Sequence, residues 1–292
     1  MPELPDLEAY RTALQPRIVG QVLTAIRFPH PFVLRTVTPR PDVLVGKRVL
    51  ETRRLGKRLV LGFEQELWLV LHLMIAGRLQ WKQSGQKIAP KLGMMALDFA
   101  TGTLLLTEAG TKRRASVHVV QGDMALAAHD PGGIEVLQAD LQTFAQKLRQ
   151  ENHTLKRALA NPHTFAGIGN AYSDEILHRA RLSPLQTTAR LDDASVENLY
   201  VATVQVLTAF RDRLCAEAMQ AWPQKVTAFR PEMAVHGKFG QPCPVCQAPV
   251  QRIVYADNEC NYCARCQTGG RLLADRALSQ LLKDSWPKTL PE

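Results

Sequence analysis

The chain has 292 residues, 46% of them hydrophobic, and a formal net charge of +9 at pH 7. A chain of this length is usually too long to fold around one hydrophobic core, so we expect more than one domain. No apolar run is long enough to span a bilayer, and the N-terminus lacks the basic and apolar regions of a secretory signal. The sequence therefore predicts a cytoplasmic, nucleoid-associated protein with no membrane partner.

Basic residues gather in two stretches of the chain. The first runs from Arg35 to Arg58 and contains Asp42 and Glu51 as its acidic residues, and the second is Lys112-Arg113-Arg114. A generally basic, solvated surface would spread its charge, whereas clusters favour contact with a phosphate backbone. The charge pattern therefore predicts a nucleic-acid partner.

The N-terminal residues Pro2 and Glu3 carry possible chemistry at the start of an expected helix over residues 2–17. Once Met1 is removed, the chain begins with a secondary amine beside a carboxylate. A free amine attacks an aldehyde-like carbon to form a Schiff base, and a carboxyl group can move the protons that this step needs. The alternative is that Pro2 is simply the first residue of the helix.

Short β-type runs without intervening helices follow, up to about residue 121. The predicted strands are residues 22–28, 43–53, 58–63, 67–73, 94–99, 103–107 and 116–121. Closely spaced strands of this kind favour a sandwich or a barrel.

A linker at residues 130–133 separates the strands from helical patterns at 140–151, 154–159, 171–180, 192–215 and 272–283. Gly167-Ile168-Gly169-Asn170 stands directly before the third helix. Glycines there let backbone N–H groups approach a phosphate at the positive end of the helix. The same pattern also occurs in ordinary tight turns.

Cysteines predict a metal site near the C-terminus. Cys243 and Cys246 form one CxxC pair, and Cys263 and Cys266 form a second. Two such pairs typically hold one structural Zn²⁺ in a tetrahedral thiolate site. Cys260 and Cys263 are a competing second pair, but the Gln-Thr-Gly-Gly that follows Cys266 supplies the tight turn of a knuckle and favours Cys263 and Cys266.

Five separate motifs together resemble the formamidopyrimidine-DNA glycosylase/endonuclease VIII (Fpg/Nei) family of base-excision repair enzymes. They are Pro2-Glu3-Leu4-Pro5, Arg54-Leu55-Gly56-Lys57, His72-Leu73, Gly167-Ile168-Gly169-Asn170-Ala171-Tyr172 and the four-cysteine ribbon. The resemblance implies an α+β multidomain fold. Its parts are an N-terminal catalytic helix and β-sandwich domain (residues 1–130), a helix–two-turn–helix DNA-binding domain (131–234), a zinc ribbon (235–270) and a C-terminal helical extension (271–292).

The resemblance also implies roles for single residues. Pro2 is the nucleophile and Glu3 the proton carrier, while Lys57 of a β-hairpin contacts phosphate beside the lesion. Asn170 grips phosphate at the start of its helix, although an ordinary N-cap would look the same. The other residues that the resemblance brings into the site are Arg113 and Arg114, which contact DNA, and Glu175 and Asn258, which have supporting positions.

Three departures from the family pattern bear on the substrate. Asn258 stands where the zinc finger usually carries an arginine, which removes a phosphate clamp. Of the methionine, arginine and phenylalanine that fill the space of the flipped base, the methionine is shifted to Met74 and the phenylalanine is replaced by Ala115. Asp6 replaces the more usual glutamate. We therefore expect a preference other than 8-oxoguanine opposite cytosine.

The sequence thus predicts a monomeric enzyme that acts on damaged double- or single-stranded DNA. It excises damaged bases through a Schiff base on Pro2 and nicks the abasic strand, and it holds one structural zinc ion. The alternative is a catalytically inactive protein that binds damaged DNA on the same scaffold. A zinc-ribbon RNA-binding protein is a third reading, which leaves the N-terminal motif unexplained.

Overall fold

The computed structural model describes residues 1–110, 112–224, 226–255, 258–285 and 287–290. The chain divides into two compact units. Unit 1 consists of Met1–Pro131 and Phe210–Thr227, and unit 2 consists of Gly132–Ala209 and Ala228–Glu292. The four domain ranges expected from the sequence stay a prediction. Within the described residues, no helix is both long enough and apolar enough to cross a membrane.

Unit 1 begins with helix α1, Leu4–Ile18, whose N-cap residue is Glu3. The helix was expected to start at Pro2, but Pro2 lies before the N-cap. The backbone N–H of Glu3 donates to Asp6 Oδ2 at 3.0 Å, so the acidic residue that departs from the family pattern caps this helix. Helix initiation therefore does not explain a proline at position 2.

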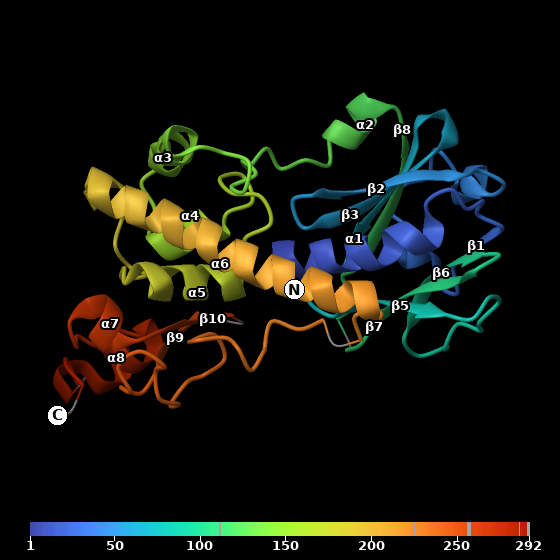
Figure 1. The fold of residues 1–292 in the computed structure, drawn as a ribbon. Helices are drawn as coiled ribbons and strands as arrows, with labels where there is room; N and C mark the ends of the chain where they lie inside the picture. Colours follow the sequence, from blue (N-terminus) through green and yellow to red (C-terminus); the bar gives the residue numbers. More distant parts are fainter. Residues whose placement is uncertain (111, 225, 256–257, 286, 291–292) are drawn as a thin grey trace. The chain divides into compact units, whose positions relative to one another are not determined.

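Two four-stranded antiparallel sheets follow α1, in the orders β1-β6-β7-β5 and β2-β3-β4-β8. Their strands are β1 Ala25–Arg27, β2 Val49–Leu55, β3 Arg58–Phe63, β4 Leu67–His72, β5 Gly77–Lys82, β6 Gly93–Phe99, β7 Gly102–Glu108 and β8 Ser116–Gln121. Helix α1 packs against β2 and β3 (Figure 1). Apolar side chains of both sheets and of α1 form one buried core, which confirms the predicted helix and β-sandwich.

The strand prediction was wrong in two places. Residues 43–48 were expected to extend a strand, but Pro41–Leu44 forms a 3-10 helix and Gly46 has φ +82°. Pro41 lacks the N–H that a strand ladder needs, and only glycine adopts that φ without strain. The prediction also missed β5, in which buried Gly77 and Leu79 alternate with Arg78 and Gln80.

Unit 2 consists of helices and a small ribbon. Its helices are α3 Leu141–Arg149, α4 Leu155–Ala160, α5 Asn170–Ala180 and the first part of α6 Asp193–Gln220, whose last turns belong to unit 1. The ribbon contains β9 Gln251–Tyr255, β10 Asn258–Tyr262 and α7 Ala264–Thr268, and α8 Arg276–Leu282 follows. Helix α5 packs on α4 and on β10 (Figure 1), so the helical layer supports the ribbon directly. A short helix in unit 1, α2 Asp123–Ala127, was not predicted.

Candidate functional site

The N-terminal end of unit 1 is buried around a carboxylate. Pro2 is buried, and Glu3 is 3% exposed at the start of α1. A carboxylate next to the first amine of the chain can exchange protons with it, because the two groups are adjacent residues on a capped helix end. Pro2 and Glu3 therefore lie at a buried helix start, and their catalytic roles stay a prediction.

The same environment changes the acidity of the chain's terminal amine. Burial lowers the pKa of the Met1 α-amine below its ordinary value. Glu3 and Asp6 oppose this shift, whereas the positive charges of Arg78 and Lys57 add to it. An amine with a lowered pKa is a free base over a wider pH range, so this end of the molecule favours a nucleophilic amine.

Lys57 lies in the hairpin turn that joins β2 to β3, where Leu55 pairs with Arg58. Gly56 has φ +57°, a conformation that glycine adopts without strain, and this lets the hairpin close in two residues. Because Lys57 contributes to the pKa of the terminal amine, the predicted hairpin lysine and the N-terminus belong to one electrostatic site.

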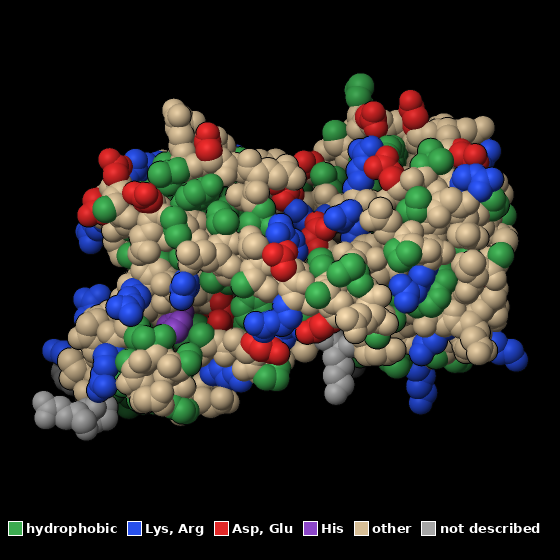
Figure 2. All heavy atoms as spheres, viewed as in Figure 1, with side chains coloured by type: hydrophobic (Ala, Val, Ile, Leu, Met, Phe, Trp, Pro, Cys, Tyr) green, Lys and Arg blue, Asp and Glu red, His purple; other side chains and the backbone are tan. Residues whose placement is uncertain are grey.

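The basic segment before β8 is fixed by a buried acid. Glu108 is 1% exposed, and its carboxylate accepts the backbone N–H groups of Arg114 at 2.9 Å and Ala115 at 3.1 Å. The Arg114 side chain is exposed, and Arg113 is half-buried and donates to the backbone oxygen of Lys91. On the face that Figure 2 shows, Lys and Arg side chains occur on both units, with acidic side chains among them.

In unit 2, Asn170 is the first residue of α5, and Gly169 is the N-cap. The reading of Asn170 as an ordinary N-cap is therefore wrong. Its amide Nδ2 donates to the backbone oxygen of Glu259 on β10 at 2.9 Å, which ties the helix start to the ribbon. Gly167 has φ +79°, so the turn before α5 uses a conformation that side chains rarely adopt.

Asp174 is the centre of a buried polar network that sequence reasoning missed. Its carboxylate accepts from Lys156 Nζ at 2.5 Å, bonds His236 Nδ1 at 2.8 Å and accepts the backbone N–H of Asn261 at 3.1 Å. Lys156 Nζ also donates to the backbone oxygen of Asn170 at 2.6 Å. Helices α4 and α5 and the ribbon are thus joined through one carboxylate, which stabilises the backbone around Asn170.

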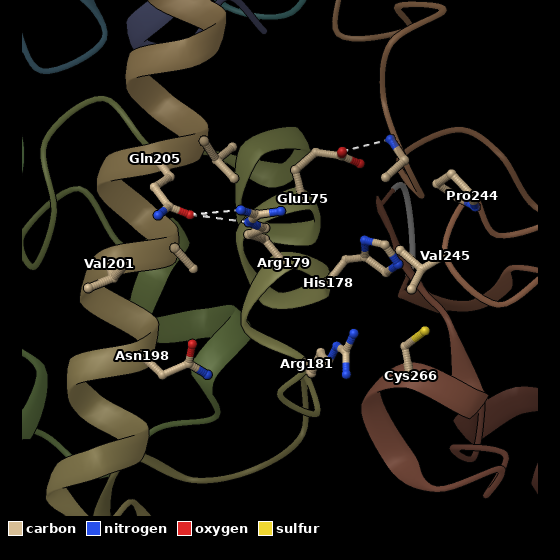
Figure 3. A pocket seen from close by; sticks show the side chains of 13 residues that line it. Glu175, His178, Arg179, Arg181, Asn198, Val201, Gln205, Pro244, Val245 and Cys266 are labelled. Carbon is tan, nitrogen blue, oxygen red and sulfur yellow. Dashed lines mark hydrogen bonds between the residues drawn. The ribbon is translucent and has the colours of Figure 1, made fainter.

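The carboxylate of Glu175, predicted as a supporting residue, contacts three backbone N–H groups. It accepts the N–H groups of Ala234, Val235 and His236 at 2.7, 2.9 and 2.9 Å. Burial raises its pKa, and these three hydrogen bonds act in the opposite direction. It lines a cavity of about 550 Å³ between α5, α6 and the ribbon (Figure 3). Glu175 therefore positions the chain that leads into the ribbon.

Four cysteines of the ribbon lie together. The Sγ atoms of Cys243, Cys246, Cys263 and Cys266 are all within 4.8 Å of one another. Zn–S bonds of about 2.3 Å in a tetrahedron place the sulfur atoms about 3.8 Å apart, so this thiol set fits zinc. Among the described residues, no other group of His, Cys, Asp or Glu has this geometry.

Two neighbours of this metal centre refine the prediction. Cys260 lies outside the group and is 2% exposed among Ile253, Tyr262 and Leu273, and burial raises its pKa well above the ordinary value. The geometry therefore favours Cys263 and Cys266 as the second pair. His178 of α5 was not predicted, and its Nε2 lies 3.2 Å from Cys243 Sγ. Figure 3 shows His178 directed from α5 towards the ribbon.

Asn258 begins β10 and is exposed, and residues 256 and 257 beside it lie outside the described part of the chain. Nearby Arg252 pairs with Glu259 at 3.7 Å and stacks on Phe239 with its guanidinium 4.3 Å from the ring centroid. The predicted residues therefore fall on both units, with Pro2, Glu3, Lys57, Arg113 and Arg114 in unit 1 and Asn170, Glu175, Asn258 and the four cysteines in unit 2.

Comparisons with known proteins define the family. Residues 1–117 match the model of the formamidopyrimidine-DNA glycosylase N-terminal domain, and residues 132–211 match that of the formamidopyrimidine-DNA glycosylase H2TH domain. The chain is 30% identical over 282 residues to the formamidopyrimidine-DNA glycosylase of Heliobacterium modesticaldum, with 91% of this chain and 100% of that protein covered. An uncharacterised formamidopyrimidine-DNA glycosylase-like protein of Mycobacterium tuberculosis is 39% identical over 152 residues, which cover 52% of this chain and 94% of that protein.

A solved structure of the Lactococcus lactis formamidopyrimidine-DNA glycosylase, bound non-covalently to DNA that contains an AP site, superimposes with a TM-score of 0.79. The two are 26% identical, and the alignment covers 91% of this chain and 99% of that chain. The chain belongs to the formamidopyrimidine-DNA glycosylase family of DNA repair proteins, which confirms the resemblance seen in its motifs.

Proposed function

We propose that the protein is a bifunctional DNA glycosylase and AP lyase of base-excision repair, with the N-terminal amine of Pro2 as its nucleophile. The observation that carries this proposal is the setting of the terminal amine. Burial together with Arg78 and Lys57 lowers the pKa of the Met1 α-amine. Removal of Met1 would place the Pro2 amine at the same end of the chain, next to the buried carboxylate of Glu3. Family membership supports damaged DNA as the substrate.

The proposed reaction starts when a damaged nucleotide is flipped out of the duplex, because its C1′ is not accessible inside the base stack. The Pro2 nitrogen forms a bond to C1′, the N-glycosidic bond breaks, and the base leaves with that electron pair and takes up a proton. The bonded nitrogen passes its proton to the Glu3 carboxylate, Glu3 delivers that proton to O4′ as the C1′–O4′ bond opens, and the nitrogen lone pair freed in this way forms the iminium. Loss of a proton from C2′ then expels the 3′-phosphate and nicks the strand.

Positive and amide groups on the two units hold the DNA backbone in this proposal. Lys57 contacts phosphate near the terminal amine, and Arg113 and Arg114 contact the strand from the segment that Glu108 fixes. Asn170, which the Lys156 and Asp174 network stabilises, contacts phosphate at the start of α5. The protein acts as a monomer on double- or single-stranded DNA.

We propose zinc as the ion of the four-cysteine centre. Zinc, when bound, has a structural role because four thiolates leave no open coordination position. Burial raises the pKa of Cys263 to about 11, so this thiol carries a proton near neutral pH, and a bound cation would displace that proton.

The departures at Ala115 and Asn258 support a lesion preference other than 8-oxoguanine opposite cytosine. A much higher rate on 8-oxoguanine opposite cytosine than on other lesions would contradict this preference.

Borohydride trapping tests the nucleophile. Met1-processed protein is incubated with DNA that contains an abasic site or 5-hydroxyuracil, and borohydride reduces any iminium to a stable adduct. We expect an adduct with the processed protein, a weaker one with Pro2→Gly, whose terminal amine is primary, and none with a form that retains residues before Pro2. Pro16→Ala is the matched control, because this exposed proline of α1 is far along the helix.

Glu3→Gln tests the proton carrier. We expect base release to slow by about 10²–10⁴-fold, while affinity for abasic DNA changes little. Equal losses of rate and affinity would contradict the role of Glu3. Absence of an adduct on every lesion, with DNA binding retained, would instead support the alternative of a catalytically inactive damaged-DNA-binding protein.

A further inference from the structure

We propose that Phe32, together with His30 and Arg113, forms a stacking site for the nucleobase that loses its partner in the strand opposite the lesion. The proposal rests on the proposed function, because it concerns a duplex from which a base has been flipped. It assigns the stabilisation of the opened duplex to a segment that none of the sequence motifs includes.

The position at which the family pattern carries a phenylalanine is Ala115 in this chain, and it cannot supply an aromatic wedge. Ala115 is 1% exposed and belongs to the core of the sandwich. Its backbone N–H is held by the carboxylate of Glu108 at 3.1 Å, so the methyl group stays inside the fold. A base pair that has been opened needs an apolar surface from elsewhere, because unstacking exposes its faces to water.

Phe32 offers such a surface on a fixed loop. Its side chain is 41% exposed in the 3-10 helix Pro31–Val33, while the next residue, Val33, is fully buried. The loop is attached to β8, since the backbone N–H of Arg35 donates to the oxygen of Val117 at 2.8 Å. An exposed aromatic ring on an anchored backbone is preorganised, so stacking a base on it costs little conformational entropy.

The neighbours of Phe32 favour a nucleobase over other ligands. The ring of His30 is stacked on that of Phe32 with centroids 5.8 Å apart, and the guanidinium carbon of Arg113 lies 6.0 Å from the Phe32 centroid. Aromatic rings with an arginine beside them stack on the faces of all bases, without sequence preference. A phosphate alone would use the arginine and gain nothing from an exposed phenyl ring.

A second exposed apolar side chain belongs to the same part of unit 1. Glu108, which holds Arg114 and Ala115, pairs with Gly77 across β7 and β5. The turn before Gly77 carries Ile75, which is 61% exposed. Strand pairing and the buried Glu108 therefore hold the turn at Ile75 and the segment at Arg113 in fixed register, and the loop at Phe32 is attached to the same strand β8.

A thermodynamic cycle on binding tests the site. Affinities of the wild type and of Phe32→Ala are measured for two duplexes with an uncleavable abasic-site analogue, one with cytosine opposite the analogue and one with a second analogue there. We expect Phe32→Ala to lower affinity roughly 5- to 100-fold for the first duplex, the range of one base–aromatic stack, and by less than about twofold for the second. Phe32→Trp should retain the affinity of the wild type.

Val37→Ala is the matched control, because Val37 is 87% exposed on the segment that follows and should change neither affinity. An equal loss on both duplexes, or no loss on either, would overturn the stacking site. Borohydride trapping separates this result from the proposed function. If an adduct forms but Phe32→Ala changes the affinities for both duplexes equally or not at all, only the stacking site is contradicted. If Phe32→Ala lowers affinity for the first duplex alone but no adduct forms, the stacking site is supported and the proposed chemistry is contradicted.

Discussion

The N-terminal end of unit 1 and the ribbon side of unit 2 carry functional groups in different ways. At the N-terminus, Pro2 and Glu3 are adjacent, and Asp6 caps the helix from three residues away. In unit 2, Asp174 reaches His236 and the backbone of Asn261 across 62 and 87 residues of chain. The first arrangement depends on local backbone geometry, and the second depends on tertiary packing and on a metal centre.

This difference has a physical consequence. The proposed nucleophile at the chain terminus needs a low pKa and a nearby proton carrier, and the capped helix end of unit 1 would provide both. In the proposed function the ribbon side grips phosphate, which needs several groups in register, and the buried pair of Lys156 and Asp174 and the four thiols would hold that register. We therefore expect damage to the ribbon side to reduce DNA binding while the terminal amine keeps its reactivity.

Loss of the metal should have the largest effect, and it tests the comparison most severely. Structural zinc sites contribute about 10–16 kcal/mol in small ribbons, so Cys263→Ser should abolish zinc retention and unfold the ribbon. Mass spectrometry of the native protein measures the zinc content of this variant, and a binding assay measures its affinity for DNA. Borohydride trapping at saturating single-stranded abasic DNA should persist, and its loss would break the proposed independence of the two regions.

Cys260→Ala is the matched control for that experiment, since Cys260 lies outside the four-cysteine group. We expect one zinc ion per chain in this variant. Loss of zinc from Cys260→Ala together with retention in Cys266→Ala would show that Cys260 and Cys263 are the metal pair.

Asp174→Asn should have the next largest effect, because it leaves Lys156 buried without its charged partner. Side-chain exposure is 14% for Lys156 and 0% for Asp174. Breaking a buried pair from one side costs about 3–5 kcal/mol. Chemical denaturation should show this loss in the free energy of unfolding. A binding assay should show a weaker affinity for abasic DNA. Asp193→Asn, whose side chain is 93% exposed beside Arg149, should change stability by less than about 1 kcal/mol.

The sequence predicts the features that depend on local backbone geometry and misses those that depend on tertiary packing. The strands β3 and β8 and the starts of α3 and α4 agree with their local patterns, because alternation and the caps Asp140 and Thr154 are properties of short segments. Cysteine spacing likewise predicted the metal group. The Asp174 network and the contact of His178 with Cys243 were missed, since a lone aspartate or histidine carries no signal until the fold supplies its partners.

A smaller effect is expected at His178, whose Nε2 is 3.2 Å from Cys243 Sγ. A protonated Nε2 donates a hydrogen bond to the thiolate and orients it towards the metal. His178→Phe should therefore lower zinc affinity about 10- to 100-fold without changing the four ligands. Competition with a chromophoric chelator measures this affinity. His163→Phe, an exposed histidine of the same unit, should leave it unchanged, and equal losses in both variants would contradict a specific contact.

The smallest predicted effect is a shift in pH dependence at the N-terminus. Arg78 lowers the pKa of the Met1 α-amine, Lys57 does so less, and we expect both charges to act in the same direction on the Pro2 amine of the processed protein. The ammonium form is unreactive, so the rate of adduct formation should rise as the pH passes the amine pKa. Removing a positive charge raises that pKa, and Arg78→Gln should therefore move the rise to higher pH, more than Lys57→Gln does. Single-turnover trapping at saturating DNA separates this shift from changes in binding.

Arg78→Lys is the control for charge, because it keeps a cation but replaces the guanidinium, whose Nη1 donates to the oxygens of both Ile75 and Gly77. A normal pH profile in Arg78→Lys with a shifted profile in Arg78→Gln would assign the effect to electrostatics. Equal shifts in both would assign it to the turn that Arg78 holds. In that case the reactivity of the amine would depend on the packing of β5 as well as on charge, and the N-terminal region would resemble the ribbon side more closely than its local contacts indicate.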